Sequence, residues 1–179
     1  LFQTSVVAQN LEKAYFAGGC FWCMEESFEK KEGVTEVISG YSGGKTKNPT
    51  YEEVTYGNTG HFETIEIIYD KSKINYKDLL DHFWKNIDPF DKYGQFCDKG
   101  YSYRSVAFYK NKEEKDLINK SIMELEKKFD KKIVTYVIEF KKFYKAEDKH
   151  QNYYQVKFLN YLRYKKACGR EQTLNKIWN

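Results

Sequence analysis

Two glycines directly ahead of a cysteine constrain the fold of this chain more than any other feature. An apolar run leads into Gly18-Gly19, and because glycine has no Cβ the pair allows a sharp turn. Beyond the turn, apolar residues recur at helical spacing, and neither glycine nor proline interrupts before Gly33. The stretch therefore predicts a strand over residues 12–17, a turn, and a helix over residues 21–31 with Cys20 at its N-terminus.

Cys20 is the candidate nucleophile. At a helix N-terminus, free backbone N–H groups and the positive end of the helix dipole face the side chain. Both stabilise a thiolate, which is the reactive form of cysteine. A buried, inert cysteine is the alternative, because free cysteines are often buried. The position of Cys20 directly after the turn and before two aromatic residues, Phe21 and Trp22, favours the reactive interpretation.

Composition predicts one domain over residues 1–179 and argues against two classes of partner. No Pro/Ser-rich linker divides the 179 residues. The net charge of +4 comes with lysines spread along the whole chain, unlike the clustered stripe of a nucleic-acid-binding protein, and no apolar run approaches the length of a membrane span. Residues 1–11 are predicted to be a poorly structured leader. Its first eight residues fit a tag remnant, a frayed end or the tail of an export signal, so we expect either a cytoplasmic or an exported, periplasmic protein.

The cysteines suit redox or nucleophilic chemistry better than a structural role. A zinc site needs two close pairs, and only Cys20 and Cys23 are close in sequence. A disulfide scaffold is not expected in a chain whose hydrophobic share, 41%, suffices for a core. We therefore expect no metal ion. We also expect that no histidine is the catalytic base or a metal ligand (His61, His82, His150).

The remaining periodicities predict an α+β fold. Strands are predicted over residues 34–40, 61–69, 103–109 and 133–140, and helices over residues 75–87 and after a capping box formed by Asn111 and Glu114. This order favours a two-layer α/β sandwich with a mixed sheet and helices on its face. Residues 141–179 are predicted to be a long C-terminal segment that wraps the core.

Strand 61–69 raises a question of phase. Its alternation puts Glu63 on the same face as Ile65 and Ile67. If that face is buried, loss of hydration raises the pKa of Glu63 and keeps the carboxyl protonated near neutral pH. If the opposite face is buried, Glu63 is a solvated strand residue. The periodicity alone leaves both possibilities open.

Five blocks of the chain resemble, in order, the A-type peptide methionine sulfoxide reductases. The most specific is Gly19-Cys20-Phe21-Trp22, which resembles the hallmark of that family. The other blocks are Gly40-Tyr41-Ser42-Gly43-Gly44 with Asn48-Pro49-Thr50-Tyr51, Gly60-His61-Phe62-Glu63, Gly94-Gln95-Phe96-Cys97-Asp98-Lys99-Gly100 with Tyr103-Arg104-Ser105, and Ala146-Glu147-Asp148-Lys149-His150-Gln151 with Tyr153.

The resemblance implies a role for each matched residue. Cys20 attacks the sulfoxide sulfur, and Glu63 is the acid that protonates the departing oxygen, which places Glu63 on the buried face. Tyr41 and Tyr103 hold that oxygen. Asp98 organises the pocket through hydrogen bonding.

The two aromatic residues after Cys20 have a different implied role. Phe21 and Trp22 form the wall that receives the methyl group of the substrate, because an apolar surface selects a methyl. The resemblance further implies the S epimer of methionine sulfoxide, either protein-bound or free. No bound cofactor is expected, and we expect a monomer.

The sequence leaves the resolving thiol open. Cys20 becomes a sulfenic acid, a second thiol condenses with it to a disulfide, and an outside dithiol, by resemblance thioredoxin, reduces that disulfide. Cys168 ranks first because it resembles the resolving position in the family's C-terminal tail. Cys23 ranks second because it lies one helical turn from Cys20, and Cys97 ranks third.

Two other functions fit parts of the sequence. A thioredoxin-like disulfide exchanger would use Cys20-x-x-Cys23. A module for single-stranded nucleic acid would use the many tyrosines and lysines for stacking and charge. The first requires Cys23 for activity and does not require Glu63, and the second requires a basic stripe that the chain lacks.

Overall fold

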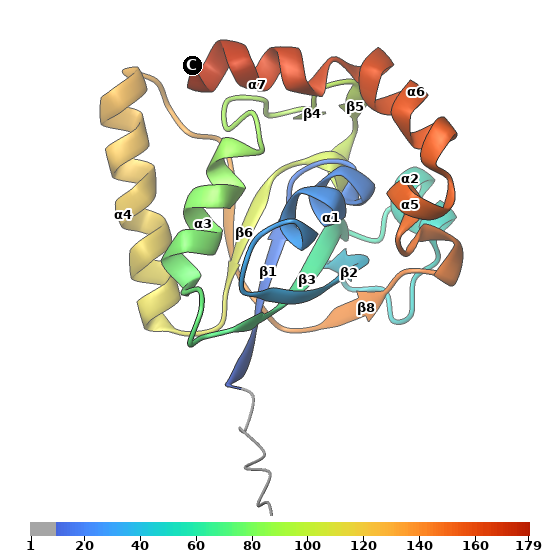
Figure 1. Cartoon of the computed structure of the whole chain (residues 1–179), viewed down its shortest axis with the longest axis horizontal. Helices are drawn as coiled ribbons and strands as arrows, with labels where there is room; N and C mark the ends of the chain where they lie inside the picture. The colour runs from blue at the N-terminus through green and yellow to red at the C-terminus, as the bar shows by residue number, and fades with distance from the viewer. Residues whose placement is uncertain (1–9) are drawn as a thin grey trace, which may run out of the picture.

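The structure is a computed structural model and describes residues 10–179 (Figure 1). Six strands form one sheet in the order β7-β6-β1-β3-β2-β8, in which all neighbours are antiparallel except the parallel pair β6 and β7. A separate hairpin pairs β4 with β5. The strands are β1 Leu11–Ala17, β2 Val34–Ser42, β3 Phe62–Asp70, β4 Gly94–Gln95, β5 Asp98–Lys99, β6 Val106–Tyr109, β7 Tyr136–Glu139 and β8 Phe143–Lys145.

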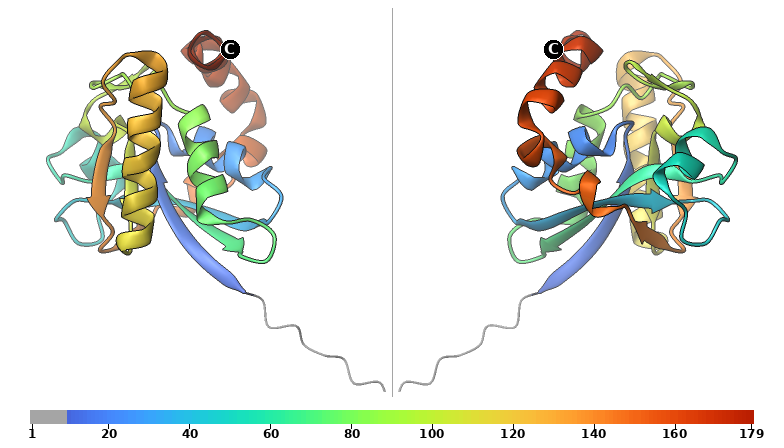
Figure 2. Two further views of the ribbon diagram at one scale, coloured as in Figure 1. Left: turned by 90° about the vertical axis from the view of Figure 1, so that its left-hand side faces the viewer. Right: turned by 90° about the vertical axis from the view of Figure 1, so that its right-hand side faces the viewer.

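Residues 10–179 contain seven α-helices, of which α3 and α4 lie side by side (Figure 2). The main core fills the space between the sheet and α1, α3 and α4, where Phe16, Phe28 and Phe83 are fully buried. The α+β sandwich with a mixed sheet is therefore confirmed. The helices are α1 Phe21–Glu29, α2 Tyr51–Tyr56, α3 Tyr76–Lys85, α4 Lys112–Phe129, α5 Tyr153–Val156, α6 Phe158–Cys168 and α7 Arg170–Trp178.

The central strand β3 is buried on both faces, and this settles the phase of Glu63. The side chain of Glu63 is 2% exposed, and Thr64, which lies on the opposite face of the strand, is fully buried. The strand is covered on one side by α1 and paired on its two edges with β1 and β2. The register sets Glu63 directly opposite Tyr41 of β2. The buried position implied for Glu63 is therefore confirmed.

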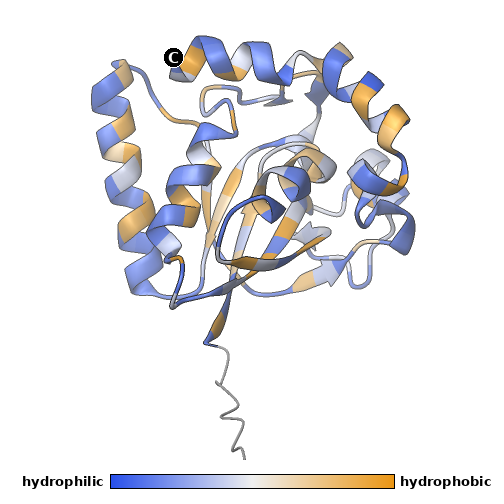
Figure 3. Ribbon diagram, viewed as in Figure 1, coloured by the Kyte–Doolittle hydropathy of each residue, from blue (hydrophilic) through white to orange (hydrophobic). Residues whose placement is uncertain are grey.

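Local signals explain where the helices begin. Asn75 caps α3, and Thr50 caps α2, each in a complete capping box. The box predicted for α4 is half formed: the side chain of Asn111 accepts from the N–H of Glu114, but the Glu114 carboxylate accepts the N–H of Lys110 instead of that of Asn111. Helix α4 presents alternating hydrophobic and hydrophilic stretches (Figure 3), and its Ile118 faces the core.

The C-terminal segment departs from the prediction at its start. Residues 143–145 form β8, which adds to the edge of the sheet beside β2. After β8 the chain forms α5, which packs against α1, and then α6 and α7 (Figure 1). The predicted leader also differs, because β1 already begins at Leu11. The prediction for residues 1–9 lies outside the described residues, and between residues 10 and 179 no helix is long and apolar enough to cross a membrane.

Candidate active site

The Gly18-Gly19 turn brings the backbone before Cys20 into close contact with Gln95. Gly19 has a φ of +82°, and a Cβ there would lie 2.5 Å from the Cβ of Gln95, so glycine is required both for the conformation and for the close approach. Cys20 is the N-cap residue of α1, and its carbonyl accepts the N–H groups of Cys23 and Met24 at 3.2 and 3.3 Å. The predicted strand, turn and helix are therefore confirmed.

Cys20 and Cys23 form a buried pair of free thiols. Each is 5% exposed, and the two side chains pack in one cluster with Tyr161. Burial raises the pKa of Cys20 well above its ordinary value, and the hydrogen bond to Cys23 and the nearby Glu63 and Asp98 raise it further. The hydrogen bond from Cys20 lowers the pKa of Cys23 to about 7, assisted by the positive charge of Arg170.

The direction of the Cys20 shift opposes the expected thiolate, which stays a prediction. Cys20 does occupy the helix N-terminus, but its side chain accepts no capping hydrogen bond. Burial and two neighbouring carboxyl groups outweigh the helix dipole there. The two shifts run in opposite directions, and they favour the proton on Cys20 and the negative charge on Cys23.

Glu63 faces the thiol pair as a neutral acid. The N–H of Phe21 donates to Glu63 Oε2 at 3.0 Å, while Oε1 is buried and has no partner. Burial, followed by the charges of Asp98 and Cys23, raises the pKa of Glu63 well above its ordinary value. A buried polar atom without a partner is costly, so Oε1 is available for a hydrogen bond to a bound molecule.

The phenols near Glu63 differ from the expected pair. The Tyr41 hydroxyl donates to Glu147 Oε2 at 2.8 Å and is thereby engaged. Tyr51 and Tyr103 instead lie beside each other and near Glu63, and burial, followed by the nearby Glu63, raises the pKa of both. The structure thus brings Tyr103 to the site as predicted and adds Tyr51, whereas Tyr41 faces Glu147.

Aromatic rings form the wall beside Cys20. Phe21 is buried, and the half-buried Trp22 stacks on Tyr153 with ring centroids 3.9 Å apart. Tyr164 meets Trp22 edge-on at 5.9 Å. His150 also packs against Trp22 through its ring, and neither of its nitrogens has a hydrogen-bond partner. The wall is therefore apolar and includes rings from α1 and from the C-terminal segment.

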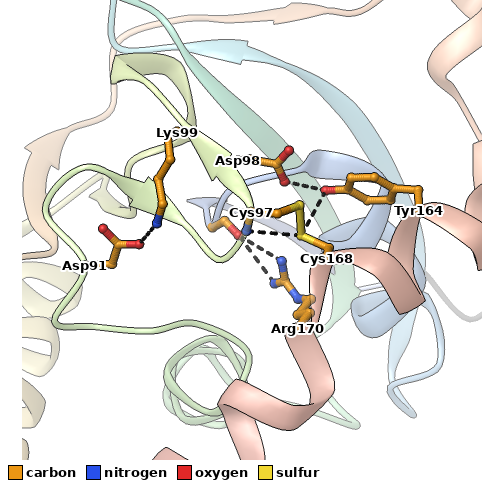
Figure 4. Close-up of a disulfide and its surroundings, with 8 residues drawn as sticks. Asp91, Cys97, Asp98, Lys99, Tyr164, Cys168 and Arg170 are labelled. Carbon is orange, nitrogen blue, oxygen red and sulfur yellow. Dashed lines mark hydrogen bonds and ion pairs between the residues drawn. A yellow bond between two sulfur atoms is a disulfide. The ribbon is translucent and has the colours of Figure 1, made fainter.

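A disulfide between Cys97 and Cys168 joins the β4–β5 hairpin to the end of α6 (Figure 4). Beside it, the Tyr164 hydroxyl donates to Asp98 (Figure 4). Burial raises the pKa of Asp98. Asp98 therefore lies at the site as expected. The disulfide was not predicted, because its two cysteines belong to segments whose pairing the sequence does not indicate.

Within residues 10–179, one group of side chains has the spacing of a metal-binding site, and it includes the two disulfide cysteines. One ligand atom each from Cys97, Asp98 and Cys168 lies within 4.8 Å of the others. The two sulfur atoms are bonded to each other, and a disulfide sulfur lacks the thiolate that binds a metal. This cluster therefore does not fit a metal in the oxidised state.

Comparisons with known proteins identify the family. The profile described as peptide methionine sulfoxide reductase matches residues 12–179. The chain belongs to this family. Peptide methionine sulfoxide reductase MsrA of Listeria monocytogenes is 45% identical over 172 residues, which cover 95% of this chain and 97% of the relative. The MsrA/MsrB protein of Vibrio cholerae is also 45% identical, and there this chain spans 45% of a longer relative.

Solved structures agree with this family membership. Methionine sulfoxide reductase A of Corynebacterium diphtheriae superposes with a TM-score of 0.74 at 28% identity, covering 83% of this chain and 76% of that one. Reduced Mxr1 of Saccharomyces cerevisiae superposes with a TM-score of 0.76 at 29% identity, covering 81% and 84%. The chain is thus an oxidoreductase of the methionine sulfoxide reductase class, as its sequence blocks predicted.

Several residues of the site were missed from sequence. Tyr51 had a usable signal, because the capping box of Thr50 and Glu53 starts a helix at Tyr51 and so fixes its direction. Tyr164 and Arg170 carried none, because they reach the site only through the path of α6 and α7. Glu147 and Tyr51 are also linked, since the N–H of Tyr51 donates to Glu147 at 2.8 Å.

Proposed function

We propose that this enzyme reduces the S epimer of methionine sulfoxide, in proteins or free, by attack of Cys20 on the sulfoxide sulfur. The observation that carries the proposal is Glu63, a buried neutral carboxyl group with one unpartnered oxygen next to a buried pair of free thiols. Each sulfoxide epimer requires its own enzyme, and the A-type blocks of this sequence support the S epimer.

The first step transfers oxygen from the substrate to Cys20. The sulfur of Cys20 attacks the sulfoxide sulfur while Glu63 protonates the oxygen, which makes that oxygen a better leaving group. The sulfoxide sulfur is reduced to the thioether of methionine, and Cys20 is oxidised to a sulfenic acid. The proton that Glu63 gives to the oxygen stays on the sulfenic hydroxyl, and the proton that leaves the Cys20 thiol as its sulfur attacks restores Glu63, so the step consumes no outside proton.

Three further groups position the substrate. Tyr51 and Tyr103 supply hydroxyl groups beside Glu63, where they hydrogen-bond the sulfoxide oxygen. Asp98 organises this end of the site through its bond from Tyr164. Phe21 and Trp22 receive the methyl group of the substrate, because their rings offer it an apolar surface.

Cys23 is the first resolving thiol in this proposal. It lies one helical turn from Cys20, and the two side chains pack in one cluster, whereas Cys168 is paired with Cys97. This reverses the order expected from sequence, where Cys168 ranked first. The Cys97–Cys168 disulfide then takes the role of a second redox pair at the surface.

Thioredoxin, or another dithiol protein, is the proposed reductant. Cys97 is exposed, so an outside thiolate can attack its sulfur, and exchange through a mixed disulfide then returns the pair to thiols. Mxr1 of Saccharomyces cerevisiae has been solved in complex with Trx2, which supports this choice of reductant. The monomer expected from the sequence stays a prediction.

One turnover without reductant tests the function. Glu63→Gln is expected to slow formation of the first methionine by roughly 10²- to 10⁴-fold, because the proton donor is lost, whereas Cys23→Ser still forms one methionine per chain. A disulfide exchanger would behave in the opposite way, with Glu63→Gln active and Cys23→Ser inactive. That second pattern would refute the proposal.

A further inference from the structure

Arg170, the first residue of α7, is a buried cation without a carboxylate partner. Its side chain is 4% exposed, and its guanidinium donates to the carbonyl of Asn86 at 2.6 Å and to the carbonyl of Gly18 at 3.4 Å. It also lies 3.1 Å from the sulfur of Met24 and over the ring of Phe96. Within residues 10–179, Arg170 takes part in no ion pair.

Such a charge requires a compensating anion. Removal of a guanidinium from water is costly, and carbonyl dipoles offset the cost only in part. Two contacts of Arg170 lie at the turn and at α1: Gly18 begins the turn, and Met24 directly follows Cys23. Cys23, the residue before Met24, is the ionisable group of α1 on which this positive charge acts.

We propose that Arg170 is the counter-charge that holds Cys23 as a thiolate and thereby makes it the nucleophile that resolves the Cys20 sulfenic acid. This inference rests on the function proposed above. The Cys23 thiolate attacks the sulfur of the sulfenic acid, the S–S bond forms and the S–O bond breaks. The departing hydroxide takes a proton from Glu63 and leaves as water, and Glu63 regains a proton from solvent. Arg170 contacts neither substrate nor the reacting sulfur atoms by hydrogen bond, so it is a positioning residue.

Other charged groups around Cys23 do not replace Arg170. Lys165 of α6 also lies near Cys23, but its ammonium pairs with Glu26 at 2.9 Å and with Glu171 at 3.1 Å. Its charge is therefore largely compensated. Arg170 is the neighbouring cation that has no carboxylate of its own.

The neutral and acidic groups around Cys23 also leave Arg170 as its counter-charge. Cys20, the N-cap residue of α1, and Tyr161 on α6 pack against Cys23 and lower its pKa. Glu63 on β3 and Tyr164 on α6 also face it, and both stay protonated because burial raises their pKa. Asp98 lies near Arg170 and Cys20, but burial raises the pKa of its carboxyl, and Tyr164 donates its hydroxyl to it.

Alkylation measures the charge on Cys23 directly. In a Cys20→Ser variant with the Cys97–Cys168 disulfide intact, Cys23 is the one remaining free thiol, so the rate of its reaction with iodoacetamide against pH reports its apparent pKa. We expect a value below that of an ordinary thiol, which is about 8.5. A value at or above that of an ordinary thiol overturns the inference, whether or not any Arg170 variant folds.

Substitution of Arg170 then identifies the source of that charge. In the same background, Arg170→Gln is expected to raise the apparent pKa by about one unit and to slow alkylation at pH 7 about tenfold. Arg170→Lys keeps a positive charge and is expected to restore most of the rate. Equal profiles for all three proteins overturn the inference.

One turnover in the full chain separates this role from a structural one and from failure of the proposed function. Arg170→Gln is expected to slow Cys20–Cys23 disulfide formation about tenfold and the release of methionine far less, so that sulfenic acid accumulates. A uniform loss in both steps shows a merely structural role and contradicts the inference. If the unsubstituted enzyme forms no methionine, the proposed function itself fails, and the Cys23 titration still decides the charge.

Discussion

Glu25 offers a sharp test of how burial acts in this fold. It lies on α1 beside the thiol pair and is fully buried, and its carboxylate accepts the Ser39 hydroxyl at 3.0 Å and the N–H of Asn152 at 2.9 Å. Asn152 directly precedes Tyr153, whose ring stacks on Trp22. Glu25 thus ties the C-terminal segment to the aromatic wall of the site.

The pH dependence of this tie follows from its pKa. Burial raises the pKa of Glu25 from 4.5 to about 7, although the hydrogen bonds from Asn152 and Ser39 oppose the rise. A raised pKa means that the contribution of Glu25 to stability is fully present below pH 4.5 and is lost as pH rises through 7. At 1.36 kcal/mol per unit, the free energy of unfolding falls by about 3 kcal/mol over that range.

Glu25→Gln removes this dependence because the amide does not ionise. Urea unfolding of both proteins at intervals from pH 4.5 to pH 8 should show the difference between their free energies of unfolding change by about 3 kcal/mol in favour of the variant. At pH 4.5 the variant is expected to be the less stable protein. Its amide nitrogen cannot accept a hydrogen bond, so one of the two donors to Glu25, Ser39 or Asn152, loses its acceptor.

The adjacent Glu26 is a matched control. Burial raises its pKa, but hydrogen bonds from Lys30, Tyr161 and Lys165 outweigh burial and lower it to about 2. Its contribution is therefore present above pH 4.5 and is lost only as pH falls toward 2. Glu26→Gln is expected to lower stability by a constant amount between pH 5 and pH 8. If Glu25→Gln also gives a constant difference over that range, the reasoning about Glu25 is refuted.

Three further predictions concern the site. Cys97→Ser or Cys168→Ser should lower the free energy of unfolding by about 2–4 kcal/mol in urea, because the disulfide closes a loop of 71 residues; an unchanged midpoint contradicts this. Tyr51→Phe should slow the first turnover more than Tyr41→Phe, since Tyr41 already donates to a carboxylate, and the reverse order in quenched-flow assays counts against the assignment. Trp22→Ala should raise KM for methionine sulfoxide more than it lowers kcat, and a pure kcat effect argues against a methyl-binding wall.

Local chemistry explains why much of the fold could be predicted. The Gly18-Gly19 turn, the capping residues Asn75 and Asn111 and the β-branched runs act within a few residues. Their strands and helices therefore formed where the sequence indicates. Strand β8 was missed because its three residues gain their structure from pairing with β2 rather than from their own pattern.

The candidate site was predictable only in part for the same reason. Cys20 and Glu63 belong to contiguous motifs, and the structure brings them together. The charge on the thiol pair was not predictable, because it depends on how much water reaches Cys20 and on the path of the chain to Arg170, which is separated from Gly18 by 152 residues. Tyr41 and Tyr51 both lie in motif blocks, and only the register of β2 against β3 and the direction of α2 distinguish them.

Trapping the oxidised thiol tests the central claim most directly. The Cys23→Ser variant, treated with one equivalent of methionine sulfoxide and dimedone and then analysed by peptide mass spectrometry, should yield one methionine per chain and a dimedone adduct on Cys20. Methionine formation with the adduct on another residue, or full methionine formation by a Cys20→Ser variant, would contradict the account.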